Sequence, residues 1–191
     1  MTKTIIIIGL GNPGKDYKKT RHNAGFLAID AFANNNSFPD FIFQKKFNAL
    51  VSEKIDDNSK IILIKPQTFM NNSGSAAAKI TTFYKIKDLL IVHDDIDLAL
   101  GKIKIVKNRG SAGHKGVESI IKTLGAKNLV RIRIGILTAA GQKKKIRAEK
   151  LVLKDFNKKE ETILNETIKK TAEAISLFLN KGITAAMNKF N

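Results

Sequence analysis

Histidines and a run of carboxylates supply the side chains best suited to move a proton in this sequence. His22 lies in the polar segment 20–25, shortly after a glycine turn, and Asp94 belongs to the acidic cluster 93–97. Histidine is the most frequent general base near neutral pH, but it needs a partner that fixes its tautomer and stabilises its charge. Because Asp94 is expected at the mouth of a strand, we take His22 as the candidate base and Asp94 as its partner.

The acidic cluster 93–97 also raises the alternative of a divalent metal. Clustered carboxylates bind magnesium in phosphoryl-transfer enzymes. Against a metal, the sequence has no helical His-x-x-x-His pair, and its three histidines are far apart along the chain. We therefore expect no metal, and we interpret Asp95 and Asp97 as turn and cap residues.

The segment 9–14 matches the G-x-G-x-x-G pattern of dinucleotide-binding turns. Pro13 removes a backbone N–H that a phosphate would need, and Asp30, the acidic residue at the expected distance, lies inside a helical pattern. A covalent mechanism has little support either, because the chain has no cysteine and no G-x-S-x-G motif. These observations argue against a nucleotide cofactor and against a nucleophilic side chain.

Two further loops carry polar groups. In segment 66–74, Asn71 is suited to orient a carbonyl group or a water, although its amide also fits an ordinary turn, with Phe69 and Met70 packed into the core. The glycine-rich loop 109–116 opens a helix, so its backbone N–H groups would suit an anion, although the glycines also fit a tight connection. Both alternatives stay open on the sequence alone.

The elements that must position these residues alternate between strand and helix patterns. Strands are expected at residues 4–8, 61–64, 89–92, 102–106 and 129–136, and helices at 26–33, 75–84, 117–124 and 157–179. This alternation predicts an α/β fold with a single three-layer domain over residues 1–191. Polar segments follow the strands that end near residues 8, 64, 92 and 106, so we expect them to share one cleft.

Composition narrows the class of protein. The formal net charge is +17 over 191 residues, which favours a polyanionic partner, although the excess of lysine also fits general compositional drift. No apolar run is long enough to cross a bilayer, and the run after Lys3 is too short for a signal peptide. With no cysteine, these features predict a cytoplasmic protein without a membrane partner.

Taken together and in this order, the motifs closely resemble those of the bacterial peptidyl-tRNA hydrolase family. The similar stretches are 9–14, 20–25, 66–74, 93–97 and 113–116, with a weaker one at 131–135. Each motif is weak by itself, but five in the same order are specific. The resemblance implies a monomeric α/β protein with a twisted mixed β-sheet flanked by helices, and no metal or organic cofactor.

The resemblance also implies roles for individual residues. His22 would be the proton acceptor and Asp94 would stabilise its basic form, while Asn12 would distinguish blocked from unblocked aminoacyl-tRNA. Tyr17, Phe69 and Asn71 fall on positions that contact the junction of tRNA and peptide. The family usually has asparagine at the position of Lys115, so the contact made there is in doubt, although a lysine would suit an RNA phosphate.

The activity implied is hydrolysis of the ester between a peptide, or an N-blocked aminoacyl group, and the 3′-terminal ribose of tRNA. An ester is easier to hydrolyse than an amide because its alkoxide, here a ribose oxygen, departs more readily, so one oriented histidine acting on water can suffice. Asn12 or Asn71 would support the oxyanion or position the water. The expected partner is peptidyl-tRNA, held by its acceptor arm and 3′ end, with no obligate protein partner. The alternatives are a non-catalytic RNA-binding module and a metal-dependent nuclease.

Overall fold

The computed structural model describes residues 3–56, 59–86, 89–125, 129–138 and 148–191. Its strands are β1 (Lys3–Gly9), β2 (Ile42–Gln44), β3 (Ala49–Asp56), β4 (Ser59–Pro66), β5 (Leu89–Ala99), β6 (Ile103–Lys107) and β7 (Val130–Leu137). Its α-helices are α1 (Ala24–Asn35), α2 (Ser73–Tyr84), α3 (Lys115–Leu124), α5 (Ala148–Val152) and α6 (Lys158–Phe190). Short 3-10 turns are η1 (Lys15–Tyr17), η2 (Arg21–Asn23) and η3 (Met70–Asn72).

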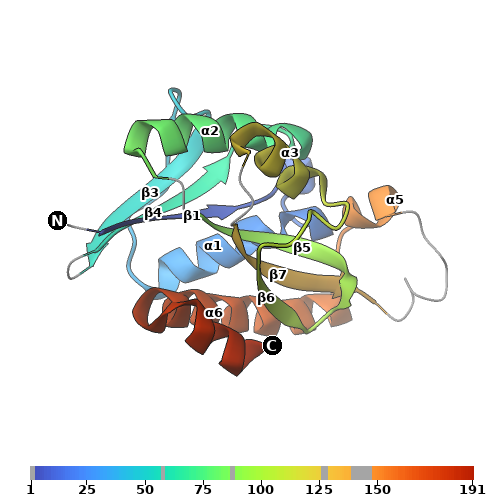
Figure 1. Ribbon diagram of the computed structural model, residues 1–191. Coiled ribbons are helices and arrows are strands. Elements are labelled where there is room, and N and C mark those ends of the chain that lie inside the picture. Colours follow the sequence, from blue (N-terminus) through green and yellow to red (C-terminus); the bar gives the residue numbers. More distant parts are fainter. Residues whose placement is uncertain (1–2, 57–58, 87–88, 126–128, 139–147) are drawn as a thin grey trace.

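The strands in these ranges form one mixed seven-stranded sheet in the order β2-β3-β4-β1-β5-β7-β6. The four central strands β4, β1, β5 and β7 are parallel, whereas β3 and β6 run antiparallel to their neighbours β4 and β7. Helices α2 and α3 cover one face, and α1 and α6 cover the other (Figure 1). The expected three-layer α/β architecture is confirmed.

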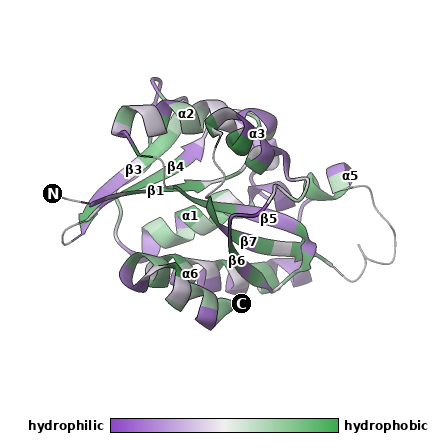
Figure 2. Ribbon diagram, in the orientation of Figure 1, coloured by the Kyte–Doolittle hydropathy of each residue, from purple (hydrophilic) through white to green (hydrophobic). Residues whose placement is uncertain are grey.

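The isoleucine run of β1 explains why the centre of the sheet is covered on both sides. Successive side chains of a strand point to opposite faces. Ile6 and Ile8 join the apolar cluster beneath α2 and α3, while Ile7 joins the cluster beneath α1 and α6. All three are fully buried, and the apolar colouring of β1 in Figure 2 continues into the neighbouring strands. A strand without a polar face must lie inside such a sheet.

Strand β5 is longer than the sequence predicts. We expected it to end at Val92, but it continues through the acidic cluster to Ala99. Hydrogen bonding to β7 extends the strand, with His93 opposite Arg133 and Asp95 opposite Gly135. Both Asp95 and Asp97 therefore lie in β5 rather than in a loop beyond it. Asp95 still makes the local hydrogen bond expected of a turn residue, since its Oδ1 accepts from the backbone N–H of Asp97 at 2.9 Å, whereas Asp97 lies inside a strand and is not a helix cap.

The loop after β6 starts at a different edge of the sheet from the one expected. Because β6 runs antiparallel to β7, the segment after Val106 starts at the sheet edge opposite to the carboxyl ends of β1, β4 and β5. The buried Arg131 holds the returning loop, since its Nη2 donates to the carbonyl oxygens of Arg109 and Gly110 at 3.0 and 2.8 Å. The loop still reaches the cleft, but by crossing back over the sheet.

Two strands and one helix end differ from expectation. Strands β2 and β3 were not predicted. β2 is only three residues long and carries the exposed Ile42 and Phe43. Helix α6 begins with the expected capping box of Asn157 and Glu160. It was expected to end before Gly182, yet helix resumes beyond that residue, whose φ of 80° marks a kink.

Candidate active site

The carboxyl ends of three parallel strands bring the candidate residues together. Asn12 follows β1, the turn η3 follows β4, and Asp94 lies in the outer half of β5. These groups, together with His22 from η2, surround one cavity of about 330 Å³. The convergence predicted from the sequence is thus present for the segments after β1, β4 and β5.

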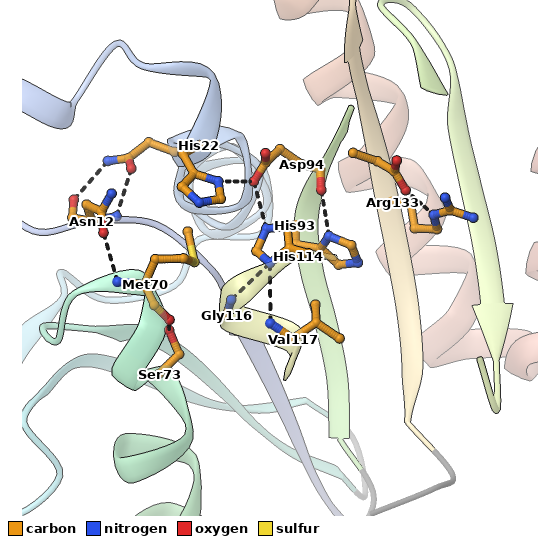
Figure 3. Close-up of polar contacts among 12 residues, drawn as sticks. Asn12, His22, Met70, Ser73, His93, Asp94, His114, Gly116, Val117 and Arg133 are labelled. Atoms are coloured by element: carbon orange, nitrogen blue, oxygen red, sulfur yellow. Dashed lines mark hydrogen bonds and ion pairs between the residues drawn. The ribbon is translucent and has the colours of Figure 1, made fainter. Parts of the chain in front are cut away.

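His22 and Asp94 form a direct pair, as expected. Nδ1 of His22 lies 2.8 Å from Oδ1 of Asp94, and both side chains are buried (Figure 3). A carboxylate only accepts hydrogen bonds, so Nδ1 carries the donated proton and Nε2 is left as the basic nitrogen. Turn η2 fixes this geometry where it leads into α1, and the backbone N–H of Arg21 donates to the carbonyl of Lys154.

Asp94 stays ionised although it is 1% exposed. Burial favours the neutral acid, but the imidazoles of His22 and His114, which donate to the carboxylate, outweigh it and hold the pKa of Asp94 well below its usual range. A buried carboxylate in this state supports a positive charge on a neighbouring imidazole. This is the electrostatic condition that a histidine base requires.

His114 is a residue of the site that the sequence analysis did not single out. Its Nε2 lies 2.9 Å from the same Oδ1 of Asp94 that His22 contacts. Its ring is 4.9 Å from that of His22 and 4.6 Å from that of His93, measured between centroids. The signal was hidden because His114 follows an antiparallel strand and enters the site only through the returning loop.

His93 also lies at the cavity, as a neutral ring. Its Nδ1 donates to the backbone carbonyl of Asp94 at 2.6 Å, whereas its Nε2 is buried and has no partner among the described residues. Burial, reinforced by the neighbouring His114, keeps the pKa of His93 well below its usual value. His93 is thus an uncharged part of the wall of the cavity.

Asn12 is oriented by its neighbours so that a donor faces the cavity. The side chain of Asn23 bonds both backbone groups of Asn12, at 2.8 and 3.0 Å. The Oδ1 of Asn12 accepts from the backbone N–H of Met70 at 2.8 Å, which identifies the other side-chain atom as Nδ2 (Figure 3). No hydrogen bond is found for this Nδ2 within the described ranges, so the amide presents a free N–H.

The other predicted residues lie at the rim. Phe69 is 61% exposed and meets the Tyr17 ring edge-on, with 6.4 Å between centroids. Asn71 is also exposed and lines the cavity beside Phe69. Lys115 lies at the opposite rim, where its Nζ is 2.8 Å from Oε1 of Glu149 in α5. Tyr17 is not among the residues that line the cavity.

The fold overturns one argument that the sequence offered against a metal. His22, Asp94 and His114 place potential ligand atoms within 4.8 Å of one another, although they are far apart in the chain. Their N···O distances of 2.8 and 2.9 Å are shorter than the roughly 3.4 Å expected between tetrahedral ligands at roughly 2.1 Å from zinc. The atoms are spaced as hydrogen-bonded partners rather than as metal ligands.

A second cavity, of about 590 Å³, is strongly basic. Its lining includes Lys104, Lys107, Arg109, Arg131 and Arg133. Arg131 adds a buried guanidinium to the other four cations. Ala112 lines both cavities. It belongs to the returning loop 108–114, which contributes further residues to each of them.

Arg133 contributes to the second cavity from a fixed position. Its Nε pairs with Oδ2 of Asp95, while Oδ1 of Asp95 accepts from the backbone N–H of Asp97. Asp95 therefore anchors an arginine between the two cavities. The pairing with Arg133 explains the burial of Asp95 and adds to its local hydrogen bond with Asp97. Among the described residues, no helix has the length and apolar character needed to cross a membrane.

Comparison with known proteins agrees with this geometry. The family model described as "Peptidyl-tRNA hydrolase" matches residues 6–191. The peptidyl-tRNA hydrolase of Thermodesulfovibrio yellowstonii is 41% identical, covering 98% of both chains, and that of Mycoplasma capricolum is 44% identical, covering 97% of this chain and 99% of the relative.

Solved structures give the same result. The crystal structure of peptidyl-tRNA hydrolase from Acinetobacter baumannii superposes with a TM-score of 0.88 at 29% identity, covering 98% of this chain and 94% of that one. A 5′-methylthioadenosine nucleosidase from Arabidopsis thaliana reaches 0.55 at 8% identity, which indicates a shared fold only. By its sequence over nearly the whole length and by its structure, the chain belongs to the peptidyl-tRNA hydrolase family.

Proposed function

We propose that this enzyme hydrolyses the ester of peptidyl-tRNA by attack of a water molecule that His22 activates. The activity follows from membership of the family. The mechanism rests on one observation, the 2.8 Å contact between Nδ1 of His22 and the buried carboxylate of Asp94. That contact leaves Nε2 as a base beside the cavity.

In the proposed reaction, Nε2 of His22 takes a proton from water as the oxygen attacks the ester carbonyl. Asp94 stabilises the imidazolium, and the carbonyl oxygen becomes an oxyanion. Collapse of the tetrahedral intermediate breaks the bond to the ribose oxygen, which leaves with the proton from Nε2. The products are a free carboxyl group and a tRNA with a free 3′-terminal ribose, and His22 returns to its starting state.

The free N–H of Asn12 suits two tasks at this centre. A preorganised amide donor stabilises a developing oxyanion. A donor also pairs with the carbonyl oxygen of an N-blocked amino group, but it repels an ammonium, which can only donate. Because Met70 occupies Oδ1 of Asn12, the amide cannot rotate to accept from an unblocked amine without losing a buried hydrogen bond. This supports the role of Asn12 in selecting blocked substrates.

The rim would hold the end of the tRNA. The exposed Phe69 ring, braced by Tyr17, offers a stacking surface for a base. Asn71 can bond the reacting end, and Lys115 can bind a phosphate after releasing Glu149. The basic residues of the second cavity would hold phosphates of the acceptor arm. We further propose a cytoplasmic monomer with a single domain and no obligate protein partner.

The decisive experiment measures release of a labelled N-acetylaminoacyl group from tRNA, with and without EDTA. We expect release from blocked substrate, little release from unblocked aminoacyl-tRNA, and the same rate with EDTA. Loss of activity on chelation would favour a metal at His22, Asp94 and His114, and cleavage inside the RNA strand would indicate a nuclease. Binding without turnover would indicate an RNA-binding module.

A further inference from the structure

His114 is a buried imidazole that links helix α3 to the carboxylate beside the proposed base. Its side chain is 8% exposed. Nδ1 lies 3.2 and 3.3 Å from the backbone nitrogens of Gly116 and Val117, so His114 caps the first turn of α3. On the other side of the ring, Nε2 lies 2.9 Å from Oδ1 of Asp94 (Figure 3).

These contacts determine which nitrogen of His114 carries the proton. A backbone N–H can only donate, so Nδ1 must accept from Gly116 and Val117. The proton of the neutral ring is therefore on Nε2, which donates to Asp94. In consequence, Oδ1 of Asp94 accepts two imidazole N–H groups, one from His22 and one from His114.

We propose that His114 is a positioning residue for the hydrolysis, acting through Asp94. The helix cap fixes the His114 ring, the ring fixes Oδ1 of Asp94, and Oδ1 orients His22 with its Nε2 toward the cavity. This inference rests on the proposed function of His22 as the base. A single hydrogen bond from His22 would leave the carboxylate free to rotate. The second donor on Oδ1, from His114, holds the carboxylate in one orientation.

The arrangement also moderates the charge that His22 meets. Oδ1 of Asp94 accepts from two donors, so each of the two hydrogen bonds is weaker than a hydrogen bond from His22 alone would be. Without the donor on His114, His22 would hold its proton more strongly and remain inactive up to a higher pH. The other titratable groups facing His114 are His93, across a 4.6 Å ring contact, and Asp94 itself.

The competing explanation is that His114 serves only as the cap of α3. Two substitutions separate the roles, because asparagine mimics the position of Nδ1 and glutamine that of Nε2. His114→Asn keeps an acceptor for Gly116 and Val117 but removes the donor to Asp94. His114→Gln keeps a donor within reach of Asp94 but removes the cap.

If His114 positions Asp94, His114→Asn lowers kcat roughly 10-fold or more with little change in KM, and the acid limb of the pH–rate profile moves to higher pH. His114→Gln stays within about 3-fold of wild type in kcat, with an unshifted profile, but its Tm falls by roughly 2 to 4 °C through loss of the cap. Ser119→Ala removes from α3 the hydroxyl that accepts from the backbone N–H of Gly74. It therefore controls for destabilisation of the same helix and should leave the pH–rate profile in place.

The proposal is overturned if His114→Asn keeps wild-type kcat and pH profile, or if His114→Gln loses as much activity as His114→Ala. Nitrogen NMR of the three histidines provides a test that needs no substrate and no stable variant. The wild-type rings should carry protons on Nε2 of His114 and Nδ1 of His22. A proton on Nδ1 of His114 would refute the proposal, whereas full activity of His22→Ala would refute the proposed function instead.

Discussion

At the scale of single residues, the site depends on one buried carboxylate oxygen and the imidazole that it orients. His22→Ala should lower kcat roughly 10²- to 10⁴-fold, the usual contribution of a positioned general base. Asp94→Asn should also be slow, because an amide can orient the ring but cannot support its positive charge. Single-turnover release of N-acetylaminoacyl groups measures both effects.

The control for these variants is the affinity for deacylated tRNA, which should change little because neither side chain lines the basic second cavity. Full activity of His22→Ala would rule out the mechanism. Loss of RNA affinity with unchanged chemistry would move His22 to a binding role.

Asn12 provides a prediction about selectivity. Replacing its amide by a carboxylate, Asn12→Asp, turns the free donor into an acceptor that attracts an ammonium. The ratio of rates on N-acetylaminoacyl-tRNA and on unblocked aminoacyl-tRNA should fall at least several-fold. Asn23→Asp is the companion variant, since it disturbs the bonds to the backbone of Asn12 without changing the group that faces the cavity. An unchanged ratio in Asn12→Asp would leave Asn12 as a turn residue.

The lowered pKa of His93 predicts how the stability of the protein depends on pH. Burial lowers the pKa of His93 in the folded protein, so below the ordinary value of about 6.5 the unfolded chain binds a proton that the folded chain does not. Stability should therefore fall as the pH drops from 7 to 5. Thermal unfolding of His93→Gln, which cannot titrate, should show a smaller fall. Asp94, whose pKa is also lowered, affects stability only nearer pH 4 and below, so the two contributions separate.

At the scale of elements, the close approach of α1 to the sheet positions η2 and His22. A Cβ on Gly25 would overlap the carbonyl oxygens of Val92, which lies within β5, and of Leu10, which directly follows β1. Gly25→Ala should therefore destabilise the protein by about 1 to 3 kcal/mol and displace η2. Urea unfolding and the assay of kcat measure the two effects.

Gly110→Ala is the matched control for this packing effect. A Cβ on Gly110 meets nothing within 4 Å, so stability should change by less than about 0.5 kcal/mol. Equal stability of the two variants would show that α1 tolerates a displacement that the static packing forbids.

At the scale of the whole molecule, the question is how much of the +17 charge acts on RNA. Lys107 lines the basic cavity, whereas Lys169 is exposed on α6 and is not among the residues that line this cavity. Lys107→Gln should reduce the slope of log affinity against log salt by about 0.7 to 0.9, the value of one phosphate contact, and Lys169→Gln should leave it unchanged. Equal reductions would mean that the charge acts diffusely.

The sequence by itself predicted the α/β architecture and the central pair of the site, His22 and Asp94. The β-branched runs at residues 4–8 and 61–64 predicted buried strands, because a strand without a polar face must be covered on both sides, and the structure places both in the centre of the sheet. His22 and Asp94 were predicted as a pair, since His22 was expected in a polar loop shortly after the first strand and Asp94 at the mouth of a later strand, and the polar segments that follow strands were expected to share one cleft.

Only the tertiary structure decided the direction of β6, the length of β5 and the place of His114. Strand direction and strand length depend on pairing with a neighbour that is distant in the chain, and residues 103–107 and 93–99 carry no local signal of that pairing. His114 lies 20 residues beyond Asp94, and it reaches Oδ1 because the returning loop is held by the buried Arg131. Such a contact is set by packing between elements, which the pattern along one element cannot express.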